Sequence, residues 1–146
     1  MSNWILVADR SRARILAPNG SDNSTLEELA VFAHPEGHQR QSDVVTDQQG
    51  RFQERGSGQH AGEPETDFKH ETAQRFASEI VGFLEKGRMA NRFKRLIVVS
   101  PPLFLGVLRD KLPSPLASMV CHEINKDLTQ LKIDELASSI PSDLWT

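Results

Sequence analysis

The fold is decided by the stretch Leu96–Phe104 (LIVVSPPLF), where an apolar run meets a helix-start signal. Leu96–Val99 contains no polar residue, which is typical of a strand buried on both faces of a sheet. Ser100, followed by Pro101 and Pro102, predicts a helix with a serine N-cap and a proline in its first turn. A strand that leads directly into a helix favours a βαβ unit with a parallel neighbouring strand and a right-handed crossover.

The residues after this stretch complete the pattern. Pro113 ends the helix, and Ser118–Ile124 predicts another apolar strand, in which Cys121 packs as a small hydrophobic residue. Asn125–Thr129 then leads into a last helix that includes Leu136. The second half of the chain therefore alternates strand and helix.

The first half predicts a meander of three strands. Trp4–Ala8 is another continuous apolar run, and Ala13–Leu16 is a short strand that ends at the turn signal Pro18–Gly20. Leu26–Ala33 is the third strand, although its first five residues also allow a helix.

A long amphipathic helix lies between the two halves. Apolar residues recur there at steps of three and four, namely Ala73, Phe76, Ala77, Ile80, Phe83 and Leu84. Thr66 is the expected N-cap, and Gly87 is expected to end the helix as its C′ residue. The whole order predicts an α/β fold in three layers, with a mixed sheet covered by helices.

Length and composition bound the class of protein. The chain has 146 residues, so we take residues 1–146 as one domain. Its formal net charge is −3, so the domain as a whole is not expected to attract nucleic acid. Cys121 is the only cysteine, which excludes an internal disulfide and a four-cysteine zinc site. No signal-peptide pattern or membrane-spanning segment is apparent, so we expect a cytoplasmic protein with no membrane or DNA partner. No Walker-type phosphate loop or Ser/His/Asp set is present, so no cofactor is expected and an enzyme is less favoured than a binding protein.

A polar run at about residues 35–65 interrupts the periodic segments. Long insertions of this kind are functional or disordered in most compact domains. Carboxylates outnumber cations between Pro35 and His70, and only the inner part, Arg51–His60, is net basic. That inner part is the candidate binding segment.

Certain strings resemble the bacterial family of proteins required for attachment to host cells. They are Trp4–Asp9 with Arg12–Arg14, Leu96–Gly106 with Leu108 and Arg109, and Lys126–Thr129. These strings are spread along nearly the whole chain, but they are mostly core and turn residues, and none is a catalytic signature.

That family is similar in turn to the middle domain of archaeal and eukaryotic peptide-release factors and of Pelota, which has an RNase H-like mixed sheet. In release factors a Gly-Gly-Gln loop before a long helix reaches the peptidyl-transferase centre. Here Ser57-Gly58-Gln59 precedes the long helix, with Ser57 where the first glycine should stand. The resemblance makes Gln59 a weak catalytic candidate. It also implies a binding loop formed by Arg51, Arg55, Gly56, Ser57, Gly58, Gln59 and His60.

Two basic groups lie outside the polar run. One is the set Arg10, Arg12 and Arg14, and the other is the set Arg88, Arg92, Lys94 and Arg95. Each has an ordinary explanation, because alternating arginines mark the solvated face of a strand and cations suit a helix C-terminus. If the two groups converge in space, they form an RNA or phosphate patch.

Metal sites are weak candidates. Asp9 ends the first strand, where an RNase H-type nuclease places a metal carboxylate, but Glu123, Asp127 and Asp134 are not convincing partners. Asp9 is expected to open a turn instead. His34 and His38 are close in sequence, but intervening Pro35 and Gly37 exclude a helical histidine pair. We therefore expect no metal site.

Three functional hypotheses follow. The first is a non-catalytic accessory protein that binds the ribosome, tRNA or other RNA through the Arg51–His60 segment. The second is an interaction or regulatory protein of the cytoplasm that affects surface attachment indirectly. The third, least favoured, is a peptidyl-tRNA ester hydrolase or an RNase H-like metal nuclease.

Overall fold

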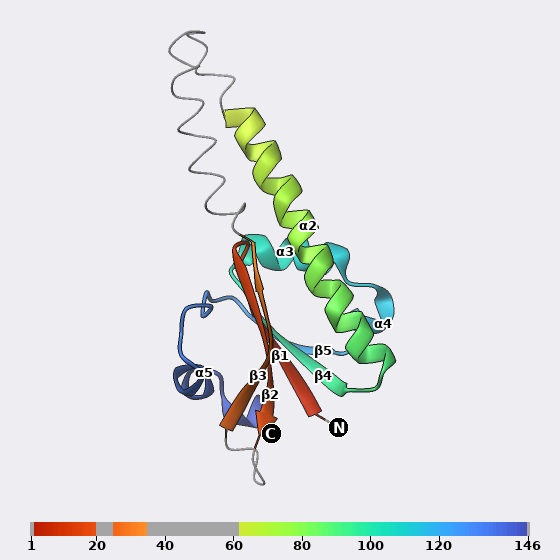
Figure 1. Ribbon diagram of the computed structural model, residues 1–146, viewed down its shortest axis with the longest axis vertical. Helices are drawn as coiled ribbons and strands as arrows, with labels where there is room; N and C mark the ends of the chain where they lie inside the picture. Colours follow the sequence, from red (N-terminus) through yellow and green to blue (C-terminus); the bar gives the residue numbers. More distant parts are fainter. Residues whose placement is uncertain (1, 20–24, 35–61, 146) are drawn as a thin grey trace.

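The computed structural model describes residues 2–19, 25–34 and 62–145, and its centre is a five-stranded mixed sheet. Strand β1 pairs antiparallel with β2 and parallel with β4, while β3 is antiparallel to β2 and β5 is parallel to β4. The spatial order is β3-β2-β1-β4-β5 (Figure 1), so the predicted meander followed by parallel strands is confirmed. The strands are β1 (Ser2–Ala8), β2 (Arg12–Asn19), β3 (Thr25–Ala33), β4 (Phe93–Val99) and β5 (Val120–Ile124).

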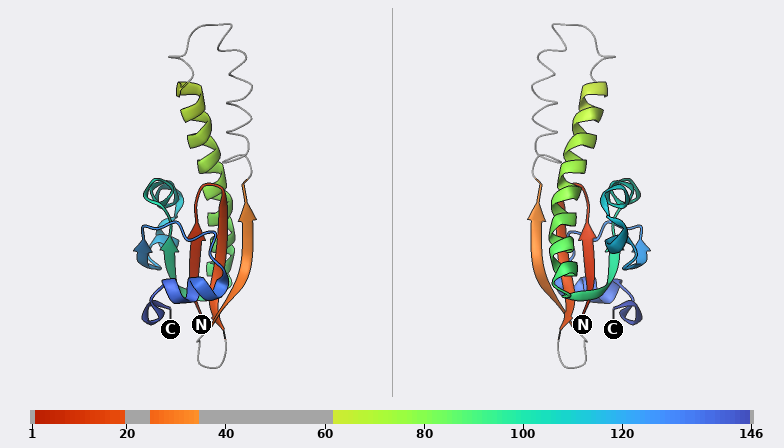
Figure 2. Two further views of the ribbon diagram at one scale, coloured as in Figure 1. Left: turned by 90° about the vertical axis from the view of Figure 1, so that its left-hand side faces the viewer. Right: turned by 90° about the vertical axis from the view of Figure 1, so that its right-hand side faces the viewer.

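Helices cover both faces of this sheet (Figure 2). On one face Trp4, Leu6 and Ala8 of β1 share a core with helices α2, α3 and α4. On the other face Ile5 and Val7 pack against α5 and the residues after it. This alternation explains why β1 reads as a continuous apolar run. The helices are α2 (Gly62–Met89), α3 (Pro102–Lys111), α4 (Ser114–Ala117), α5 (Ile133–Ser139) and the 3-10 helix η3 (Ser142–Leu144).

Helix α2 begins at Gly62, so the prediction that Thr66 is its N-cap is wrong. Pro64 falls in the first turn, where its missing N–H breaks no helical hydrogen bond. The predicted apolar stripe is nevertheless confirmed, because Phe76, Ile80 and Leu84 are buried in the core. The helix therefore takes up the last part of the polar run expected to extend to about residue 65.

Gly87 does not end α2, contrary to the prediction. It is buried within the helix, and a Cβ atom there would lie 2.6 Å from two ring atoms of Trp4. The helix continues to Met89, and Asn91 adopts the left-handed conformation, with φ 56°, after it. Glycine is therefore needed at position 87 for the close approach of the Trp4 indole.

Three other local predictions are corrected. Ser100 does not cap α3, because its hydroxyl donates to the Pro101 carbonyl at 3.2 Å and Pro101 is the N-cap. Cys121 is exposed rather than buried, because β5 is an edge strand. Pro18 and Asn19 belong to β2 rather than to a turn, and Pro18 lies beyond the residues of β2 that pair with β1. Its missing N–H therefore breaks no bond in that ladder.

Among the described helices, none combines the length and hydropathy needed to cross a membrane.

Candidate functional site

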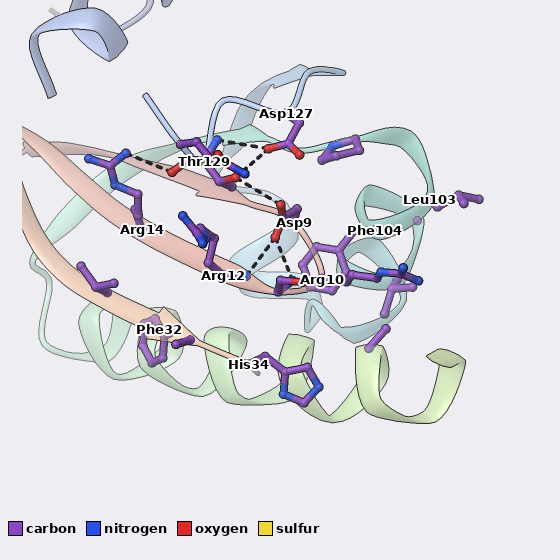
Figure 3. A pocket seen from close by; sticks show the side chains of 18 of the residues that line it. Asp9, Arg10, Arg12, Arg14, Phe32, His34, Leu103, Phe104, Asp127 and Thr129 are labelled. Carbon is purple, nitrogen blue, oxygen red and sulfur yellow. Dashed lines mark hydrogen bonds between the residues drawn. The ribbon is translucent and has the colours of Figure 1, made fainter. Parts of the chain in front are cut away.

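A groove of about 1630 Å³ lies at the end of the sheet where β1 and β4 finish (Figure 3). It is lined by residues of Asp9–Arg12, Val31–His34, Pro101–Val107 and Asp127–Leu131, together with parts of β2, β3 and α2. We call it the sheet-end groove. The chain leaves β1 toward β2 on one side and leaves β4 toward α3 and β5 on the other. Ligands of open α/β sheets bind at such a point, beyond the carboxyl ends of neighbouring parallel strands.

Asp9 builds the turn that forms one wall of the groove, as predicted. Its Oδ1 accepts hydrogen bonds from the backbone N–H groups of Ser11 at 2.8 Å and Arg12 at 2.9 Å. Its own N–H donates to the Arg12 carbonyl at 2.9 Å, and the His34 N–H donates to the Ser11 carbonyl at 2.7 Å. The turn between β1 and β2 is therefore tied to the end of β3.

Thr129 joins this turn to the segment after β5. Its buried hydroxyl lies 2.7 Å from Asp127 Oδ1 and 3.1 Å from Asp9 Oδ2. A hydroxyl carries one hydrogen, so it donates to one of the two carboxylates at a time. The Thr129 N–H also donates to Asp127 Oδ1 at 3.2 Å. Two carboxylates are thereby held side by side on the polar wall of the groove.

Arg14 anchors the same segment from β2. Its guanidinium forms an ion pair with Glu28 at 2.6 Å. It also donates to the carbonyl of Thr129 at 3.2 Å and to the carbonyl of Leu131. Arg14 is therefore occupied in holding the walls of the groove together.

The two predicted basic groups do not come together. Arg10, Arg12 and Arg14 line the sheet-end groove, near the carboxyl end of β1, where Arg14 pairs with Val7. The second group surrounds the start of β4, which pairs with the opposite end of β1. Seven residues of strand separate these ends, roughly 20 Å.

Part of the second group has local partners. Arg88 forms an ion pair with Glu85 at 2.6 Å, and this hydrogen bond lowers the pKa of Glu85 below its ordinary value. Arg92 stacks over the Trp4 ring at 5.3 Å. Lys94 and Arg95 are exposed on β4. The two basic groups therefore do not form a joint RNA or phosphate patch, which was predicted only if they converged in space.

Arg109 and Glu123 link α3 to the edge strand β5. Arg109 Nε donates to Glu123 Oε2 at 3.1 Å, and its terminal nitrogen donates to the other oxygen. The hydrogen bond from Arg109 lowers the pKa of Glu123 below its ordinary value. The Glu123 carboxylate is thus already paired with the Arg109 guanidinium.

The carboxylates considered as partners of Asp9 are now placed. Asp127 is its neighbour through Thr129, whereas Glu123 pairs with Arg109 and Asp134 lies in the first turn of α5. Among the side chains that the structure describes, no three of His, Cys, Asp or Glu are grouped to hold a metal ion.

The remaining predicted site residues divide between described and undescribed parts of the chain. His34 stacks on Phe76 with ring centroids 4.9 Å apart. His38 and the set Arg51, Arg55, Gly56, Ser57, Gly58, Gln59 and His60 lie outside the described residues. Their binding role stays a prediction.

Sequence reasoning missed the contribution of Thr129 and the apolar wall made by Phe104 and Val107. Asp127-Leu128-Thr129 follows a predicted strand, and the ends of strands are where parallel sheets collect polar side chains. That position was the available signal. Asp9, the partner of the Thr129 hydroxyl, lies 120 residues away, and no local sequence pattern predicts that contact.

Comparison with known proteins identifies the family of the chain. A family model described as "Protein required for attachment to host cells" matches residues 4–140. An uncharacterised protein of Rickettsia prowazekii (strain Madrid E) is 35% identical over 80 residues, which cover 53% of this chain and 53% of the relative. Matched over nearly its entire length, the chain belongs to the family of proteins required for attachment to host cells.

Proposed function

We propose that this chain is a non-catalytic accessory protein of the ribosome or of other RNA, and that it binds through Arg51–His60. The supporting observation is the place of that segment. It directly precedes α2, a helix of 28 residues, as the glutamine loop precedes the long helix of the release-factor domain that the sequence resembles.

The shape of α2 agrees with this role. Among the side chains of α2 that the structure describes, the buried ones begin at Thr72, and the first turns of the helix extend beyond the end of the sheet (Figure 1). A helix that projects from its own core can carry an attached segment into the cavity of a large partner. Ser57, which stands where release factors have a glycine, favours binding over ester hydrolysis.

Ribosome co-sedimentation tests the proposal. We expect the full chain to pellet with ribosomes at low salt and the Gln59→Ala variant to pellet less. A chain that stays in the ribosome-free fraction at every salt concentration would exclude the proposed association.

A second function, regulation through protein contacts, is favoured by two exposed apolar side chains. Leu103 is 90% exposed and Val31 is 61% exposed, and both line the sheet-end groove. Exposed apolar residues beside a groove are a feature of protein contact surfaces. In that case the chain would influence attachment indirectly. A pull-down that recovers defined partners with the native chain and loses them with Leu103→Ser would support this alternative, and equal recovery would oppose it.

A further inference from the structure

We propose that the sheet-end groove binds a nucleoside phosphate, with the phosphate on Arg12 and the base against the wall formed by Phe104 and Val107. The ligand is either a free nucleotide or an unpaired nucleotide of RNA, and only the RNA source rests on the function proposed above. The site differs from the Arg51–His60 segment.

The location is the first support. The groove opens beyond the carboxyl ends of β1 and β4, where the chain departs in opposite directions from two parallel neighbours. This is the place in an open α/β sheet where a ligand meets several loops at once. The groove volume of about 1630 Å³ leaves room for a nucleotide and bound water.

The charges of the groove identify an anion-binding cation. Arg14 is paired with Glu28, and Arg109 is paired with Glu123. The exposed Arg12 guanidinium has no hydrogen-bond or ion-pair partner among the described residues. A guanidinium binds phosphate through two parallel hydrogen bonds, so Arg12 can hold the phosphate of an incoming ligand.

The carboxylates beside Arg12 favour a ligand that presents hydroxyl donors to them over one that presents a second anionic group. Asp9 and Asp127 share the single hydrogen of Thr129. When this hydrogen is donated to Asp127 Oδ1, which also accepts the Thr129 N–H at 3.2 Å, Asp9 Oδ2 is left without it. A ribose hydroxyl supplies such a donor, and acidic residues beyond a strand bind ribose in this way in nucleotide-binding sheets.

The opposite wall is apolar. Phe104 and Val107 of α3 line it, and Leu103 stands exposed at its rim. Phe104, Asp9 and Arg10 line the same groove (Figure 3), so the apolar and polar walls belong to one concavity. Phe104 is only 4% exposed, so a flat base would contact this wall mainly at Val107 and at the exposed Leu103. A nucleoside phosphate is the ligand class that brings a base, hydroxyls and an anion together.

The test is a titration of the ¹⁵N-labelled full chain with AMP, adenosine, inorganic phosphate and a short unpaired oligoadenylate. AMP is expected to move the amide signals of Asp9–Arg12, Leu103–Val107 and Thr129–Leu131. Arg12→Ala should weaken AMP binding about tenfold, through loss of a charge-assisted contact. Arg95→Ala removes the same charge at the other end of the sheet and should leave the affinity unchanged.

The outcomes separate the two ligand sources. If oligoadenylate binds in an Arg12-dependent way and AMP does not, the ligand is a nucleotide within RNA. If AMP binds as well as the oligonucleotide does, the ligand is the free nucleotide. Lack of binding by both, adenosine binding as well as AMP, or affinity unaffected by Arg12→Ala would each overturn the proposal. Gln59 is not among the described residues that line the groove, so the effect of Gln59→Ala on ribosome binding tests the other proposal separately.

Discussion

The Thr129 hydroxyl lies 3.1 Å from Asp9 Oδ2, although 120 residues separate the two in sequence. This contact joins the turn after the first strand to the segment after the last one. It holds the polar wall of the sheet-end groove in place, because the same hydroxyl also reaches Asp127.

Removing this hydroxyl should destabilise the fold. Thr129→Val keeps the shape of the side chain but leaves Asp9 and Asp127 without their shared donor, at a cost of about 1–3 kcal/mol. Urea denaturation gives the free energy of unfolding. Thr129→Ser retains the hydroxyl and should lie much closer to the native protein. Equal stability of the valine and native proteins would show that the contact contributes nothing.

Two glycines of α2 should respond in opposite directions to alanine. At Gly87 a Cβ atom would lie 2.6 Å from Trp4, so Gly87→Ala should destabilise by about 1–3 kcal/mol. At Gly82 nothing lies within 4 Å of the added atom, so Gly82→Ala should stabilise by about 0.5–1 kcal/mol. Thermal unfolding of the two variants checks the pair. Equal shifts of both would contradict the close approach of Trp4 to α2.

The Glu123 carboxyl should titrate below the ordinary range of a glutamate. The hydrogen bond from Arg109 lowers its pKa in the folded protein. The resulting contribution to stability is present above the pKa of the unfolded state and is lost as the pH falls through the folded pKa. The pair is exposed, so this contribution is small.

¹³C NMR of the Glu123 side-chain carboxyl group measures its titration directly. Arg109→Gln should raise the pKa of Glu123 toward its ordinary value. Arg88→Gln is the matched control, since it should raise the pKa of Glu85 and leave Glu123 unchanged. A Glu123 titration that is indifferent to Arg109→Gln would contradict the ion pair.

Cys121 should react with a thiol reagent in the native protein, because it is exposed on the edge strand β5. Native and urea-unfolded chains should be labelled by a disulfide reagent at comparable rates. Strong protection of Cys121 from the reagent in the native chain would contradict its exposure and would support the buried position predicted from the sequence.

The fold was largely predictable because the apolar residues of its core strands themselves indicate that these strands are buried. Trp4–Ala8 and Leu96–Val99 are apolar throughout, and the three-to-four-residue steps of α2 indicate an amphipathic helix with one buried face. Residues whose roles depend on distant neighbours were misjudged. Gly87 faces Trp4, and Cys121 is exposed because β5 lies at the sheet edge.

The site was harder to predict for the same reason. Asp9 was recognised as a turn residue, since its hydrogen bonds are local. Its link to Thr129 crosses most of the chain and appears only once the sheet is assembled. The two basic groups looked equivalent in sequence, yet they lie at opposite ends of β1.

Association with ribosomes through Arg51–His60 is most directly tested by co-sedimentation of the native chain, Gln59→Ala and Gln48→Ala over a range of salt concentrations. Gln48 is a matched control, because it lies in the same polar run but outside the proposed binding segment. We expect the native chain and Gln48→Ala to pellet with ribosomes and Gln59→Ala to remain largely in the supernatant. Failure of the native chain to pellet at any salt concentration, or equal pelleting of all three proteins, would contradict the account.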